Sequence, residues 1–144
     1  MLLANVNQGL TASFIQFLMK KGKKNTAEVL IPELFKVLKK DYKKEPLLLV
    51  NQALENTKPL VGFRNVRLRG TSYKIPYFLK EQEQRKIVFC WFLRSAKRSK
   101  IGIAKSLAKC LFEASLKQGD LIKRRDSIHK LANQNKVFAH YRWF

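Results

Sequence analysis

The spacing of apolar residues changes once along this chain, and that change constrains the fold more than any other feature of the sequence. From Phe14 to Asn56, and again after Glu81, apolar residues recur at the period of amphipathic helices. Between Leu60 and Leu79 they alternate with polar residues, as on a half-buried strand. The sequence therefore predicts an all-α fold with one inserted two-stranded β-hairpin.

Three helices are expected before the hairpin. The first ends at a basic loop around Gly22, because glycine readily takes the positive φ that terminates a helix. The segment Asn25–Glu28 predicts a capping box. In this motif the N-cap side chain accepts a hydrogen bond from a backbone amide of the first turn, and the carboxylate of Glu28 accepts one from the backbone amide of the N-cap residue. It starts a second helix, which Pro32 should kink without ending. Pro46 suits the first position of a third helix that runs to about Asn56.

Three more helices are expected after the hairpin. The fourth begins directly after it, and the fifth runs from about Ile103 to a glycine C-cap at Gly119. Asp120–Lys123 is expected to connect to the last helix, which continues into the terminal segment. The sequence shows no internal repeat and no linker, so we predict a single six-helix domain over 1–144 with a hairpin arm at about 60–79.

The net charge narrows the choice of partner. Lys and Arg number 30 against 10 Asp and Glu, which gives a formal charge of +20. Self-repulsion of this size opposes compaction unless a polyanion neutralises it, and nucleic acid does so through many phosphate contacts. An anionic membrane is the rival, but the cations occur in nearly every segment and no apolar run is long enough to span a bilayer. With 46% hydrophobic and 11% aromatic residues, the chain is typical of globular proteins.

Residues that could support catalysis or metal binding are sparse. Cys90 and Cys110 lack companions at metal-ligand spacing and are expected to be small buried hydrophobic residues. Ser127 and His129 lie two positions apart on a helix and do not face each other, so we expect His129 to be a partly exposed residue of a basic helix. His140 is expected to stack or pack. We predict no enzyme activity, no metal, no cofactor and no small-molecule substrate.

Three clusters of cations suit nucleic acid. They are Lys20, Lys21, Lys23 and Lys24 before the second helix; Arg64, Arg67, Arg69 and Lys74 with Tyr73 on the hairpin; and Lys123, Arg124 and Arg125 at the last helix, followed by Lys130 and Arg142. Interleaved cations and aromatic rings suit RNA, although a solvated lysine loop and a core role for Tyr73 remain open. Cations at the start of a helix are repelled by the positive end of its dipole. An external anion bound at the third cluster would therefore reduce this electrostatic repulsion.

Five segments of the chain resemble, in order, the bacterial-type family of ribosomal small-subunit protein seven. The likeness extends from Ser13 to Trp143, and its final motif is highly specific. The segments are Gly22–Glu28 (GKKNTAE), Ala53–Pro59 (ALENTKP), Arg67–Pro76 (RLRGTSYKIP), Lys123–Ala132 (KRRDSIHKLA) and Asn135–Trp143 (NKVFAHYRW).

The resemblance implies six helices with a hairpin arm, and binding to the 3′ major domain of small-subunit rRNA in the head of the subunit. It implies that the arm lies near the exit-site tRNA and the mRNA path, with other head and platform proteins, including platform protein eleven, as neighbours. By position, Arg94, Lys97 and Arg98 on the fourth helix join the rRNA-facing cations. The main rival is another basic helical protein that binds DNA or regulatory RNA; a metal-dependent nuclease would need an acidic cluster.

The chain departs from the family pattern at three places. Met1–Thr11 lacks the arginines of the usual N-terminal arm, Arg69 replaces a second turn glycine, and Cys90 replaces a common arginine before Trp91. The N-terminus shows neither a signal peptide nor a transit peptide. Abundant Lys, Leu, Phe and Asn favour an organelle-encoded protein, and we expect the mitochondrion ahead of the plastid or the bacterial cytoplasm.

Overall fold

A computed structural model of the chain describes residues 11–99 and 101–143, without the side chains of 142 and 143. Residues 11–18 are helical. The later elements are α2 (Lys24–Tyr42), α3 (Pro46–Thr57), β1 (Val61–Leu68), β2 (Thr71–Phe78), α4 (Glu81–Arg98), α5 (Ile103–Ser115), α6 (Asp120–Gln134) and the 3-10 helix η1 (Lys136–Trp143). This order confirms the predicted helical fold with a hairpin between α3 and α4.

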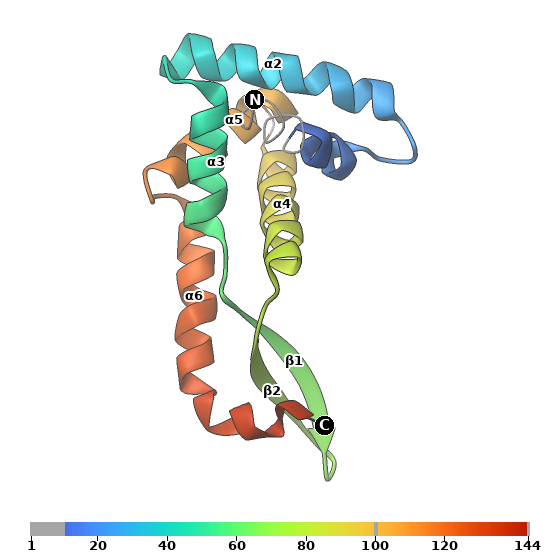
Figure 1. The fold of residues 1–144 in the computed structure, drawn as a ribbon, viewed down its shortest axis with the longest axis vertical. Helices are drawn as coiled ribbons and strands as arrows, with labels where there is room; N and C mark the ends of the chain where they lie inside the picture. The colour runs from blue at the N-terminus through green and yellow to red at the C-terminus, as the bar shows by residue number, and fades with distance from the viewer. Residues whose placement is uncertain (1–10, 100, 144) are drawn as a thin grey trace, which may run out of the picture.

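The helices and the hairpin occupy opposite ends of an elongated molecule (Figure 1). α2 lies across one end, and α3 and α4 run from there toward the hairpin. α6 continues past α3 along the side of the hairpin, and η1 then turns to lie against β2. The hairpin therefore projects away from the helical core, with α6 beside its base and η1 against its outer half.

The core lies among α2, α3, α4 and α5. Its most deeply buried large side chains include Leu34 and Leu38 of α2, Val50 of α3, Phe92 of α4 and Leu111 of α5. Burying an apolar side chain of this size stabilises a fold by about 1.5–3 kcal/mol relative to exposure. Because the four helices share these contacts, each depends on the others for its stability.

The predicted capping box at the start of α2 is wrong. The helix begins at Lys24, and its N-cap residue, Lys23, makes no side-chain cap bond. The hydroxyl of Thr26 donates to the Lys23 carbonyl (2.8 Å) instead of accepting from an amide. Pro32 does lie inside α2, on its exposed side. Pro46 is the first residue of α3, as predicted.

The expected connection before the last helix is also wrong. Asp120–Lys123 forms the first turn of α6, with Gly119 as its N-cap residue. Gly119 has a φ of 92°, and a Cβ there would lie 2.8 Å from a carboxylate oxygen of Glu113. Only glycine fits both demands, so Gly119 starts α6. The predicted glycine C-cap of the fifth helix is wrong, because α5 ends at Ser115 with Leu116 as its C-cap residue, and a short turn separates it from α6.

The hairpin turns at Arg69 and Gly70, so Thr71 and Ser72 are the first residues of β2 and not part of the turn. Val61 pairs with Phe78 at the base and Leu68 pairs with Thr71 at the tip, which leaves two residues in the turn. Both turn residues have positive φ, 48° and 85°, as a type I′ turn requires. The arginine therefore adopts the left-handed conformation that a second glycine would supply.

Neither of the two cysteines that were predicted to be buried is fully buried. Cys90 is exposed, because the buried face of α4 runs through Val88, Phe89, Trp91 and Phe92 and position 90 falls outside it. Leu47 is half-buried and Ile103 exposed, since each lies in the first turn of its helix, beyond the centre of the core. Cys110 is half-buried.

Candidate nucleic-acid interface

The outer half of the hairpin presents a cationic face. Strand register places Arg67 opposite Ser72 and Lys74 opposite Asn65, so these four side chains share one face. All four are exposed, as is Arg69 in the turn. Arg67, Arg69 and Lys74 have no carboxylate partner among the residues that the structure describes. This face therefore holds three cations whose charge is not neutralised within the described chain.

The opposite face of the hairpin is aromatic and packs on the tail. Tyr73 lies 5.1 Å from the ring of Phe138 and 6.3 Å from that of Tyr141, centroid to centroid. Arg64 is exposed but belongs to this face, with its guanidinium 5.6 Å from the ring of Tyr77. Tyr73 is half-buried, so it has a packing role in this structure. Arg64 is the one predicted hairpin cation that does not share the cationic face.

An apolar groove of about 650 Å³ lies between the hairpin and the tail. Ile75 and Pro76 line it from the hairpin, and Ala132 and Ala139 line it from α6 and η1. Arg64 and Lys136 are the cations in its wall. The hairpin therefore does not pack closely against the tail along its whole length.

The α6 cluster divides into structural and available cations. Arg125 donates to the Asn56 carbonyl at the end of α3 and, from Nε, to Asp126 (2.9 Å). The guanidinium of Arg124 lies 5.0 Å from the ring centre of Trp91 on α4. Lys123 and Lys130 are exposed and make no ion pair with another described residue. Arg125 therefore holds α6 against the core, whereas Lys123, Lys130 and the exposed Arg124 are available to bind a ligand.

The dipole argument for this cluster does not hold. α6 starts at Asp120, so Lys123, Arg124 and Arg125 follow the first turn, where the dipole field is weak. Asp120 occupies the first turn, where an acid is favourable. The predicted electrostatic cost, and with it the need for an external anion, is therefore absent.

The remaining predicted cations lie at the helical end of the molecule. Arg94, Lys97 and Arg98 are exposed on α4, the last two in its final turn, where they complement the helix dipole. Lys20, Lys21, Lys23 and Lys24 are exposed in and after the basic loop. Lys24 pairs with Glu28 (3.3 Å). The side chain of Arg142 lies outside the described residues.

The sequence reading overlooked a fourth group of cations. Lys39, Lys40, Lys43 and Lys44 lie at the corner where α2 meets α3. All four are exposed. Four lysines within six positions were the available signal.

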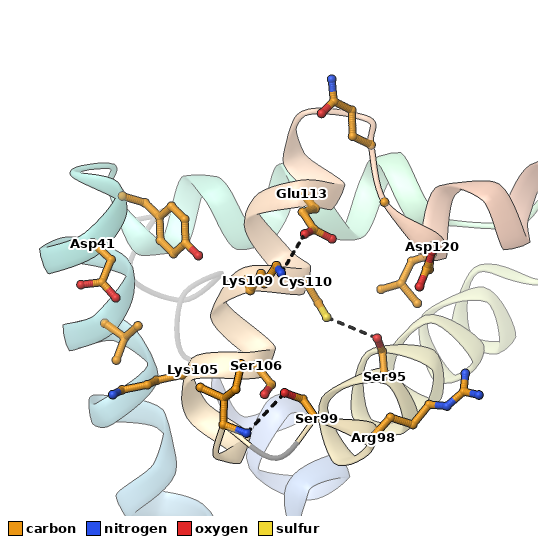
Figure 2. A pocket seen from close by; sticks show the side chains of 16 residues that line it. Asp41, Ser95, Arg98, Ser99, Lys105, Ser106, Lys109, Cys110, Glu113 and Asp120 are labelled. Carbon is orange, nitrogen blue, oxygen red and sulfur yellow. Dashed lines mark hydrogen bonds and ion pairs between the residues drawn. The ribbon is translucent and has the colours of Figure 1, made fainter.

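A second cavity, of about 840 Å³, opens among α2, α4, α5 and the turn before α6 (Figure 2). Its charges are mixed, and Lys109 pairs with Glu113 across 3.9 Å.

Ser95 Oγ and Cys110 Sγ, which both line this cavity, lie 3.3 Å apart. Burial raises the pKa of the Cys110 thiol, which disfavours the nucleophilic thiolate. Burial, together with Asp41 and Glu113, also raises the pKa of Tyr42. The cavity therefore lacks an activated nucleophile.

The two histidines make structural contacts. The backbone N–H of Leu60 donates to Nε2 of His129 (3.1 Å), which joins the base of the hairpin to α6. The hydroxyl of Ser127 donates to the Lys123 carbonyl, so Ser127 and His129 do not form a nucleophile–base pair. His140 packs against Tyr141 with ring centres 3.9 Å apart. No cluster of three potential metal ligands occurs within residues 11–99 and 101–143.

The model of the family described as ribosomal protein S7p/S5e matches residues 3–136, most of the chain. The chain belongs to the ribosomal S7 family. It is similar to "Small ribosomal subunit protein uS7m" of Reclinomonas americana, with 33% identity over 95% of this chain and 87% of the relative. It is also similar to uS7 of Colwellia psychrerythraea (35% identity; 93% of this chain, 86% of the relative) and of Desulfosudis oleivorans (35%; 97% and 90%).

Membership in the S7 family confirms the resemblance carried by the five sequence motifs. The chain is a structural protein of the small ribosomal subunit. Within the part of the chain that the structure describes, no helix has the length and apolarity to cross a bilayer.

Proposed function

We propose that this protein binds the 3′ major domain of small-subunit rRNA and organises the head of the subunit, with its hairpin near the exit-site tRNA and the mRNA path. The observation that carries the proposal is the cationic face of the hairpin, where Arg67, Arg69 and Lys74 are exposed without carboxylate partners among the described residues. The hairpin projects from the helices, so this face can enter a space between RNA segments (Figure 1).

The chemistry of the exposed cations suits recognition of RNA shape. Lysine and arginine neutralise phosphates and release counterions, which supplies affinity with little dependence on base sequence. Helical RNA exposes phosphates and 2′-hydroxyl groups more readily than base edges, so fixed cations on a rigid protein recognise its geometry. The proposed contacts are Lys20, Lys21, Lys23, Lys24, Arg94, Lys97, Arg98, Lys123, Arg124, Lys130 and Arg142, in addition to the hairpin cations.

We further propose a mitochondrial ribosome as its location, with other head and platform proteins as neighbours. A residue composition typical of AT-rich genomes and the similarity to uS7m of Reclinomonas americana support this choice. The similarity to bacterial uS7 proteins makes a plastid or bacterial ribosome the competing location. The proposed role is structural, without catalysis.

Binding of the full chain to a 3′ major-domain rRNA fragment, measured across salt concentrations, tests the proposal. In Arg67→Glu/Lys74→Glu, the loss of two phosphate contacts should lower affinity and reduce the slope of log K against log salt by roughly two. Lys86→Glu/Lys117→Glu makes the same charge change at exposed lysines elsewhere and is the matched control. Absence of wild-type binding at low salt, or equal losses in both variants, would overturn the proposal.

A further inference from the structure

The corner between α2 and α3 lies at the end of the molecule opposite the hairpin (Figure 1). Side chains at this corner form a cationic hollow. The hollow has a volume of about 630 Å³. Lys39, Lys43 and Lys44 stand around it, and Phe35 and Leu47 are among the apolar residues that line it. A cationic rim around an apolar floor is the defining feature of this corner hollow.

The lysines of the corner hollow are not neutralised by neighbouring acids. None of the three forms an ion pair with a residue in the described ranges. Glu45 also lines the hollow, but it is a single acid beside three lysines, and it is the N-cap residue of α3, where the positive helix end favours a carboxylate. The mouth of the hollow therefore keeps an excess of positive charge.

Helix stabilisation accounts for only part of this cluster. Lys39 lies in the last turn of α2, where a cation complements the dipole. Lys43 is the C-cap residue of α2, where a cation is also favourable, whereas Lys44 lies just before the positive N-terminus of α3, where a cation is unfavourable. Lys43 also has a φ of 50°, a left-handed conformation that a non-glycine residue adopts at a cost. The ammonium group of Lys44 lies 5.5 Å from the ring centre of Phe112, a favourable contact within the fold. These contacts stabilise individual lysines, but they do not neutralise the positive charge that the three lysines share.

We propose that the corner hollow is a second RNA-binding site, which seats a nucleotide with its phosphate on Lys39, Lys43 and Lys44 and its base and ribose against the floor of Phe35 and Leu47. A nucleotide fits both parts of the hollow, because its phosphate is anionic and the faces of its base are apolar. The inference rests on the proposed rRNA binding and adds a contact at the α2–α3 corner, where none of the contacts proposed above lies.

The test compares three forms of the full chain on the same 3′ major-domain rRNA fragment. They are the wild type, the corner variant Lys39→Gln/Lys43→Gln/Lys44→Gln, and the control Lys86→Gln/Lys105→Gln/Lys117→Gln, which removes the same charge from exposed lysines elsewhere. The corner variant should bind at least about tenfold more weakly near 0.1 M salt and lose roughly two to three from the salt slope. The control should lose less than half as much.

Backbone cleavage footprints of the bound RNA locate the contact. The corner variant should expose nucleotides different from those exposed by Arg67→Glu/Lys74→Glu. Equal effects of the corner and control variants, or identical footprints for corner and hairpin variants, would overturn the second site. If the corner variant keeps RNA affinity but no longer binds a glutamate-rich peptide that the wild type binds, the hollow is a protein-docking surface and the inference is wrong. Failure of the wild type to bind the RNA would instead remove the proposed function.

Discussion

Arg125 donates from its guanidinium to the main-chain carbonyl of Asn56, which lies 69 positions earlier in the chain. The side-chain amide of Asn56 in turn donates to the carbonyls of Ala114 (3.1 Å) and Ser115 (3.0 Å) at the end of α5. One asparagine thus joins the ends of α3 and α5 to α6. This junction explains why a cation expected to face RNA is directed into the protein.

Substitution of Asn56 by alanine should lower the free energy of unfolding by about 1–3 kcal/mol, because two half-buried hydrogen bonds to α5 are lost. Urea unfolding followed by circular dichroism measures the change. Gln52→Ala, at an exposed position of the same helix, is the control and should change the free energy by less than about 0.5 kcal/mol. Equal values for the two variants would show that the junction does not stabilise the fold.

The turn residues of the hairpin should respond in opposite directions. Gly70→Ala should destabilise the hairpin by about 1 kcal/mol, because φ is 85° at this position. An added Cβ would have no neighbour within 4 Å, so the loss would come from the backbone conformation and not from a clash. Arg69→Asn should stabilise it by up to about 1 kcal/mol, because asparagine tolerates the left-handed conformation and Asn-Gly favours the type I′ turn. Hydrogen exchange of the hairpin amides reads out both changes. A loss of protection in both variants would contradict the assigned turn.

The two cysteines should differ in reactivity with iodoacetamide. Cys90 is exposed and should be alkylated quickly, whereas Cys110 is half-buried and its raised pKa leaves less thiolate at a given pH. Raising the pH should therefore be needed to bring Cys110 to a comparable rate. Mass spectrometry of the peptides at several times measures each rate separately. Faster labelling of Cys110 in the folded protein would contradict its position between α4 and α5.

Replacement of Tyr73 by leucine should loosen the tail from the hairpin. The substitution removes the ring contacts with Phe138 and Tyr141, worth about 0.5–1.5 kcal/mol each. Limited proteolysis should then cut the 136–143 segment several times faster than in the wild type. Phe78→Leu alters an aromatic residue of the same strand that is 80% exposed, and it should leave the cleavage rate unchanged. Similar rates for Tyr73→Leu and the wild type would rule out this docking role.

Most of the fold follows from local sequence periodicity. The apolar stripe of α2, the proline that starts α3 and the alternation from Leu60 to Leu79 were sufficient to predict helices and hairpin. The errors fell at element ends, where competing hydrogen bonds decide the outcome. Thr26 could cap a helix or bond to the preceding carbonyl, and only the folded chain shows that it does the latter.

The candidate site was harder to predict, because a cation's charge does not reveal its partner. Arg67 and Arg125 look equivalent in sequence, yet the first is exposed on the hairpin and the second bonds to α3. The pairing of Arg125 with Asn56 joins residues far apart in the chain, which periodicity cannot show. The corner hollow was missed because its floor and rim come from two helices and the turn between them.

A ribbon of only two strands also has open flanks, where unpaired amide and carbonyl groups could recruit a strand from another molecule. Near the tip, Arg67 and Lys74 would place positive charges beside those of an added strand from a second copy. Nearer the base, Pro76 has no backbone N–H to donate to such a strand. We expect the same positive charge that suits a polyanion to disfavour strand pairing between two free copies, because pairing would bring like charges together. One set of side chains would then both bind the RNA and protect the hairpin edges.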